Sequence, residues 1–192
     1  MDGAGKSTQL TLLADALRSR GRDVVTTREP GGTALGERLR AVLLDRDSVG
    51  VAPAAEVLLF AAARAELVAE VIRPALDAGR WVVCDRFVDS SLAYQGVARG
   101  TGIEAVWDAN RLAVEGCLPD RALVLDLPVG DARVRSGGDD RIEAEGDGFQ
   151  QRVAAGYREL ASRFPERVTL VPARGSVQDV HAAVMAAVET LL

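Results

Sequence analysis

A glycine-rich turn that leads directly into an amphipathic helix restricts the fold of this chain more than any other feature. The turn reads GAGKST (residues 3–8), and apolar residues follow it at helical spacing, at Leu10, Leu13, Ala14 and Leu17. Gly5, Lys6 and Ser7 match the end of the phosphate-binding loop pattern Gly-x4-Gly-Lys-Ser/Thr. Such a loop normally follows a buried strand, so the turn predicts an α/β fold. The alternative is a glycine-rich turn that only caps a helix.

Lys6 is unusual within the composition. Of the 23 lysines and arginines, Lys6 is the only lysine. A GC-rich coding bias accounts for the excess of arginine but not for the position of the exception. A compact ammonium group fits a tight loop around a phosphate, where a planar guanidinium would clash. We therefore expect Lys6 to be functional.

Strand-like and helix-like segments alternate along the rest of the chain. Strands are predicted at 23–29, 81–87, 121–128 and 167–173, and helices at 34–44 (capped by Thr33), 54–78, 103–116, 149–163 and from about 177 onward. Alternation of this kind predicts a parallel sheet with helices on both faces. Ligands of such sheets bind beyond the carboxyl ends of the strands. The charged residues there are Arg28, Glu29, Asp85, Arg86 and Asp126.

The length and composition of the chain predict one folded domain spanning residues 1–192. The chain is 48% hydrophobic and 27% charged, and no apolar run is long enough to cross a membrane. The two cysteines, Cys84 and Cys117, suggest no disulfide framework, so we expect a reducing, cytoplasmic location. A net charge of −5 argues against general nucleic-acid binding.

Six stretches resemble one enzyme family. DGAGKST, TREPGGT, LLFAAAR, DRFVDSSLAYQG, LPD and DDRIE occur in the order and spacing of bacterial thymidylate kinases, which are P-loop nucleoside monophosphate kinases. The resemblance covers essentially the whole chain. It implies a P-loop NTPase fold, a three-layer α/β/α arrangement around a parallel sheet. It also implies transfer of the γ-phosphoryl group of ATP to dTMP, giving ADP and dTDP for dTTP biosynthesis. Mg²⁺ would be required, and a homodimer is common in the family.

In that family the central one of five strands precedes the loop, and this chain lacks it. The first glycine of the loop pattern would stand one position before Met1. We expect a gap between the neighbouring strands, where each unpaired ladder group costs about 1–3 kcal/mol. The sequence therefore predicts that Met1 is an internal residue of the native protein. Reading the upstream DNA in frame would test this.

The resemblance assigns the loop to the ATP side of the site. Its residues would bind the triphosphate at the helix N-terminus: Asp2, Gly3, Ala4, Gly5, Lys6, Ser7 and Thr8. Lys6 would bridge the β- and γ-phosphates, and Ser7 would hold Mg²⁺. Asp2 and Asp85 would order the ion or its waters. The structural alternative is that Asp85 and Arg86 form a pair that holds two strands together.

The dTMP side is assigned in the same way. Phe60 and Arg64 are one helical turn apart, and an aromatic plane beside a fork of donors suits a planar base. Their family counterparts stack on thymine and bond to it, although Phe60 alone also fits a core position. The counterpart of Arg86 contacts the dTMP phosphate, assisted by those of Arg28 and Arg40, and Glu29 matches a residue near the substrate.

The remaining candidates follow the predicted strand at 81–87 and the strand at 121–128. Ser91, Tyr94 and Gln95 resemble family contacts to the base and sugar, with Tyr94 crowding the 2′ position; a solvated loop is the alternative. Residues 133–148 resemble a lid. Gly3 occupies a loop position that is basic in some family members, so the lid would supply the charge through Arg135 and Arg141, with Arg133 behind them. An ordinary surface loop is the alternative.

Two rival functions remain open at this point, another P-loop nucleotide or nucleoside kinase and a truncated, non-catalytic chain.

Overall fold

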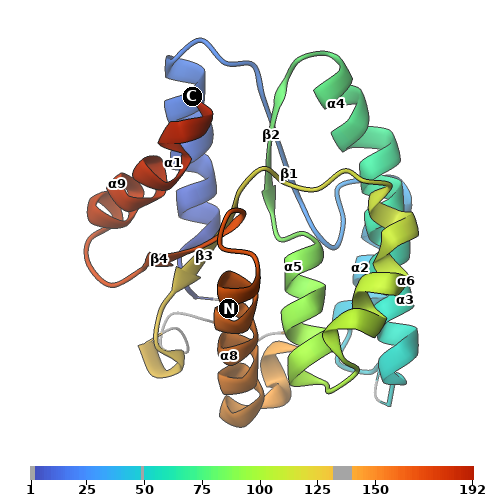
Figure 1. The fold of residues 1–192 in the computed structure, drawn as a ribbon. Coiled ribbons are helices and arrows are strands. Elements are labelled where there is room, and N and C mark those ends of the chain that lie inside the picture. The colour runs from blue at the N-terminus through green and yellow to red at the C-terminus, as the bar shows by residue number, and fades with distance from the viewer. Residues whose placement is uncertain (1–2, 49, 132–139) are drawn as a thin grey trace.

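The computed structural model describes residues 3–48, 50–131 and 140–192, which form an α/β structure (Figure 1). Four strands are present in the described residues: β1 (Val24–Arg28), β2 (Trp81–Asp85), β3 (Ala122–Asp126) and β4 (Val168–Pro172). The main helices are α1 (Lys6–Ser19), α2 (Ala34–Leu44), α3 (Pro53–Leu67), α4 (Arg73–Asp77), α5 (Val88–Ser91), α6 (Ile103–Val114), α8 (Asp147–Arg163) and α9 (Val177–Val188). Shorter helical turns are η1 (Val68–Ile72), η2 (Leu92–Ala98), η3 (Glu143–Glu145) and η4 (Glu189–Leu191).

The predicted helices and strands are present, with one predicted helix divided and an unpredicted helical stretch, α5 and η2, after β2. The helix expected at 54–78 is divided into α3, the π-helical turn η1 and α4. Pro74 stands at the start of α4 and has no N–H to donate, so regular helical bonding cannot pass through it. Thr33 caps α2 as expected, because its hydroxyl accepts a hydrogen bond from the Gly36 amide.

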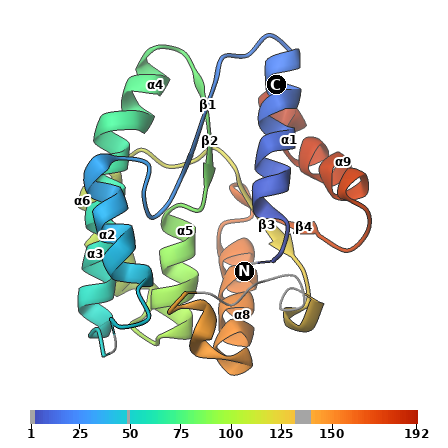
Figure 2. The same ribbon diagram turned by 180° about the vertical axis from the view of Figure 1, so that it is seen from behind.

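The strands lie between two helical layers. Leu13 and Leu17 of α1 pack with Val184 of α9 on one face, and alternate strand residues such as Val83 and Leu123 point into this cluster. Helices α3, α6 and α8 and turn η2 cover the opposite face. Figures 1 and 2 show α1 and α9 at one side of the molecule and α2, α3, α4 and α6 at the other. The predicted three-layer α/β/α arrangement is therefore confirmed.

The strands form two separate parallel pairs. β1 pairs with β2, with Arg28 opposite Asp85, and β3 pairs with β4, with Asp126 opposite Pro172. Within the described parts of the chain, no strand joins β2 to β3. A cavity of about 670 Å³ lies along both of these strands and is lined by every residue of each. The gap predicted between the neighbours of the central strand is therefore present.

The cavity also leaves the strands on either side of it partly exposed. Strands of a parallel sheet with helices on both faces are usually buried, yet all residues of β2 and of β3 are only half-buried. Their side chains alternate between the two helical layers, but one edge of each strand faces the cavity. None of the described helices combines the length and the apolar character that crossing a bilayer requires.

Candidate active site

The glycine-rich turn forms the N-terminus of α1. Gly5 adopts a left-handed backbone with φ of 87°, and its carbonyl accepts the first helical hydrogen bond from the Gln9 amide at 3.0 Å. Ala4 is buried against Leu127 and Ala173, which follow β3 and β4, so the turn is anchored on this strand pair. The helix is 14 residues long, and its dipole favours an anion at this end. Ser7 and Thr8 are exposed there, and Asp2 lies outside the described residues.

Charged residues from the strand ends share one space with this turn. Lys6, Asp85, Arg86 and Asp126 all line the large cavity beside β2 and β3. The sequence predicts one crevice for the charged residues at the carboxyl ends of the strands. Asp85, Arg86 and Asp126 share this cavity as expected, whereas Arg28 and Glu29 do not line it. The arrangement places a cation from α1 and a cation that follows β2 at the same opening.

A second, smaller cavity of about 80 Å³ collects the residues expected to bind the acceptor nucleotide. Its lining includes Glu29, Arg40, Phe60, Arg64, Arg86, Ser91, Tyr94 and Gln95. Ligand pockets usually enclose about 300–1,000 Å³, so a nucleotide requires this cavity to widen. Asp140 and Ile142 form part of its wall, which means that a shift of this segment would enlarge it.

Arg64 is the most strongly held side chain of this cavity. It is 1% exposed, and its Nε and Nη2 donate to the Glu29 carboxylate at 2.5–3.0 Å. Its Nη2 also donates to Ser91 Oγ at 3.1 Å, and its Nη1 donates to Asn110. Burial raises the pKa of Glu29, an effect that the neighbouring guanidinium opposes. These hydrogen bonds fix the orientation of the guanidinium for which the sequence predicts a contact with a base.

Arg86 connects the two cavities. It follows β2 directly, has a left-handed backbone with φ of 69°, and lines both cavities together with Ser90. Left-handed geometry is uncommon for a residue with a side chain and often marks a functional position. The guanidinium carbon of Arg86 lies 5.1 Å from the centre of the Tyr94 ring, within cation–π range.

The residues after β2 are buried rather than solvated. Ser91, Tyr94 and Gln95 belong to α5 and η2 and are only 2–5% exposed. The Tyr94 ring packs edge-on against Phe149 and Tyr157 of α8. The alternative that this stretch is a solvated loop is therefore wrong.

Arg28 and Arg40 occupy different positions around the acceptor cavity. Arg40 lines it and donates to the Pro30 carbonyl at 2.9 Å. Arg28 is half-exposed and donates to Glu37 at 2.9 Å, and it is not part of the cavity lining. A hydrogen bond from the Gly32 amide is the main cause that lowers the pKa of Glu37, with Arg28 contributing.

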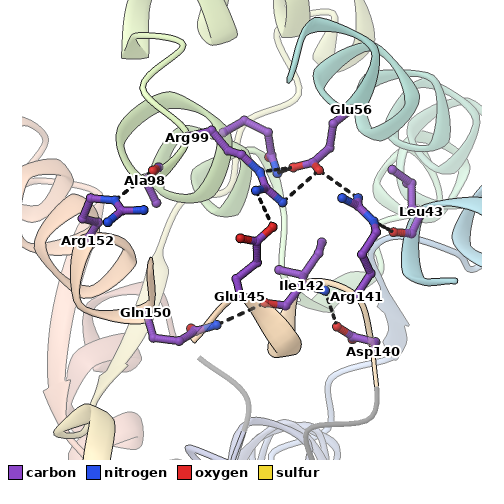
Figure 3. A network of polar contacts seen from close by, with 11 residues as sticks. Leu43, Glu56, Ala98, Arg99, Asp140, Arg141, Ile142, Glu145, Gln150 and Arg152 are labelled. Carbon is purple, nitrogen blue, oxygen red and sulfur yellow. Dashed lines mark hydrogen bonds and ion pairs between the residues drawn. The ribbon is translucent and has the colours of Figure 1, made fainter. Parts of the chain in front are cut away.

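The described end of the expected lid is held by a buried ionic network (Figure 3). Arg133 and Arg135 lie outside the described residues. Arg141 donates to the Glu56 carboxylate at 2.8 Å and to the Leu43 carbonyl at 2.9 Å, so this lid candidate is held against α2 and α3.

Sequence reasoning missed Glu56 and Asn110, although a signal for each was present. Glu56 lies about one turn before Phe60 and two turns before Arg64 on the same helix. Asn110 lies on the buried stripe of α6. A polar residue on an apolar stripe is informative, because burial without a partner is costly. In contrast, Cys84 offers no nucleophile, because burial raises its pKa well above the ordinary value of 9.0.

Comparison with known proteins gives one consistent result. The family model described as thymidylate kinase matches residues 1–184. The chain is 50% identical to the thymidylate kinase of Rhizorhabdus wittichii, over 100% of this chain and 94% of that protein. It is 48% identical to the thymidylate kinase of Desulfovibrio desulfuricans, over 100% and 93%. The crystal structure of thymidylate kinase from Ehrlichia chaffeensis superposes with a TM-score of 0.80 at 31% identity, covering 98% of this chain and 94% of that one. The chain therefore belongs to the thymidylate kinase family.

Proposed function

We propose that this protein transfers the γ-phosphoryl group of ATP to dTMP, giving ADP and dTDP for the synthesis of dTTP. One observation carries the proposal beyond family membership. Arg86 lines both the cavity that contains Lys6 and the cavity that contains Phe60 and Arg64. A nucleotide base held by the second pair would place its phosphate near Arg86, facing a triphosphate held at Lys6.

The donor side consists of the turn before α1. The backbone N–H groups of Gly3, Ala4, Gly5 and Lys6 would bind the triphosphate at the helix N-terminus, and Lys6 would neutralise charge on the β- and γ-phosphates. Its ammonium group is compact enough for this turn, whereas the arginines that replace lysine elsewhere in the chain are not.

Magnesium suits the oxygen donors proposed for it. Ser7 offers a hydroxyl and Asp85 a carboxylate, and both are the hard oxygen ligands that Mg²⁺ prefers. The described parts of the chain contain no cluster of three or more His, Cys, Asp or Glu side chains. Mg²⁺ commonly takes one or two protein ligands and completes its shell with water and substrate phosphates, so a cluster is not required. When bound, the ion supplies charge neutralisation at the phosphates, and Asp2 is a further candidate ligand.

On the acceptor side, Phe60 provides a flat apolar surface for thymine. Arg64 fixes the cavity wall through Glu29 and Ser91, and Tyr94 would crowd a ribose 2′-hydroxyl. Arg86 would bind the dTMP phosphate, with Arg40 close to the same cavity.

Phosphoryl transfer requires the protein mainly to align the two phosphates and to neutralise their negative charge. Positioning two phosphates in line and surrounding them with cations accounts for most of the catalysis of phosphoryl transfer. Lys6, Arg86 and Asp85 would take this role, and Arg135 and Arg141 are the lid candidates. We also propose a homodimer in the cytoplasm, with no membrane or nucleic-acid partner; the net charge of −5 is consistent with the last point.

A coupled assay that follows ADP formation tests the proposal. We expect dTMP to be the preferred acceptor over dUMP, UMP, AMP and thymidine. Arg86→Met should lower kcat/KM for dTMP by about 100-fold or more, since removing one oriented charge from a transition state typically costs this much. Arg111→Met is the matched control, because Arg111 is well exposed on α6 and forms an exposed ion pair with its neighbour Asp108 at 3.4 Å. Preference for another acceptor, or equal activities of the two variants, would contradict the proposal.

A further inference from the structure

Glu56 is a buried carboxylate with a complete set of hydrogen bonds. It is 1% exposed, and its two oxygens accept four hydrogen bonds from three side chains. Gln95 Nε2 donates at 2.8 Å, Arg99 donates twice at 3.2 Å, and Arg141 Nη2 donates at 2.8 Å (Figure 3). A carboxylate has about four lone-pair positions, so none is left over. The donors come from η2, from the residue after it, and from the end of the lid segment.

The carboxylate fixes which way the Gln95 amide points. An ionised carboxylate can only accept hydrogen bonds, so the amide must present its nitrogen to Glu56 and its oxygen to the opposite side. Gln95 is 2% exposed and lines the acceptor cavity. With its nitrogen turned toward Glu56, the amide directs its one acceptor, Oε1, away from Glu56.

The two arginines maintain this state of Glu56. Burial alone would raise the pKa of Glu56, but the hydrogen bonds from Gln95, Arg141 and Arg99 outweigh it and leave the pKa below the ordinary value of 4.5. Glu56 is therefore ionised at neutral pH. A neutral glutamine at this position would allow two amide orientations, because it can both donate and accept.

From this geometry we infer that Glu56 is a positioning residue that orients the Gln95 amide to select a nucleobase with an N–H at position 3. The inference rests on the proposed binding of dTMP in the smaller cavity. Thymine and uracil carry a proton on N3, which an acceptor oxygen can receive. Cytosine carries a lone pair there, which an acceptor oxygen repels. Glu56 thus acts on base selection without touching the base, through one intervening side chain.

The ratio of kcat/KM for dTMP to kcat/KM for dCMP measures this selection on the 192-residue chain. We expect Glu56→Gln to lower the ratio about tenfold or more, because a flipped amide donates to cytosine N3 and no longer accepts from thymine. A purely structural loss would lower both activities together and leave the ratio unchanged. The matched control is Glu104→Gln, which removes a carboxylate from an exposed pair with Arg163 at 2.7 Å and should leave the ratio unchanged.

Two further variants make the result decisive. In a Gln95→Ala background, Glu56→Gln should cause no additional fall in the ratio, since its effect passes through Gln95. If Glu56→Gln does not fold, Glu56→Asp is used instead. This variant keeps the negative charge for Arg99 and Arg141, but its shorter side chain withdraws the carboxylate from Gln95. The dTMP-to-dCMP ratio should then also be lower than that of the wild type. An unchanged ratio in the folded Glu56 variants, or an additional fall in the Gln95→Ala background, overturns the inference. Failure of the wild-type protein to phosphorylate dTMP would instead contradict the proposed function.

Discussion

The ion pair between Glu29 and Arg64 gives the sharpest test of how the acceptor cavity is stabilised. Their side chains are 3% and 1% exposed, and the carboxylate accepts from both Nε and Nη2 of the guanidinium. Glu29→Gln keeps the size and one acceptor oxygen but leaves the positive charge uncompensated in the core. Removing one partner of a buried pair costs about 3–5 kcal/mol. We expect the lower end of that range, since Ser91 and Asn110 still accept from Arg64.

Urea unfolding followed by far-UV circular dichroism measures this loss. A change of about 3 kcal/mol should lower the midpoint by roughly 1 M or more, since denaturant slopes are about 1–3 kcal/mol per M. The matched control is Glu189→Gln, which breaks an exposed pair with Arg20 at 3.4 Å and should cost less than about 1 kcal/mol.

A double variant separates the loss of the pair from the cost of the unpaired charge. Adding Arg64→Met to Glu29→Gln removes the buried cation and should restore part of the lost stability. Equal midpoints for Glu29→Gln and Glu189→Gln would refute the reasoning, because a buried and an exposed pair would then contribute alike.

Three other outcomes are expected. Lys6→Ala should abolish phosphoryl transfer while leaving the circular dichroism spectrum and the melting temperature nearly unchanged. Near-normal turnover of this variant would contradict the assignment of the glycine-rich turn to the active site. Gly32→Ala should lower the free energy of unfolding by about 1–3 kcal/mol in urea titrations, because Gly32 has φ of 80° and an added Cβ would lie 2.6 Å from Thr27 Oγ1 and 2.7 Å from Leu67 Cδ1. The stability that Glu56 contributes is complete above its ordinary pKa of 4.5 and is lost as the pH falls through its lower folded-state value. Urea midpoints should therefore fall more steeply below pH 4.5 for the wild type than for Glu56→Gln, and parallel curves would exclude this role.

Much of the fold follows from local pattern. Hydrophobic periodicity locates most of the helices and strands. The carboxyl-end rule predicts one crevice for the charged residues at the strand ends, and Asp85, Arg86 and Asp126 share an opening while Arg28 and Glu29 lie outside its lining. The resemblance of short motifs to the family predicts which residues lie on the acceptor side. Most of these residues line one cavity, and Arg28 is the exception.

The partners of the site residues were not predictable in the same way. Arg64 is held by Glu29, Ser91 and Asn110, which come from three other segments of the chain. Spacing along one helix says which residues share a face, but not which distant side chains fill their hydrogen bonds. The same limit applies to Arg141, whose binding to Glu56 depends on how the lid segment packs on α3.

The separation of the strands into two pairs also affects how the site keeps its dimensions. The turn that carries Lys6 rests on residues after β3 and β4 through Ala4, whereas Arg86 extends from β2. Across the described residues, no backbone hydrogen bonding between strands connects β2 with β3. The distance between Lys6 and Arg86 is therefore set by the packing of side chains between the helices. A change in the packing of these helices would therefore change the distance between the two cations. Amide hydrogen exchange along the inner edges of β2 and β3 would report such a change directly.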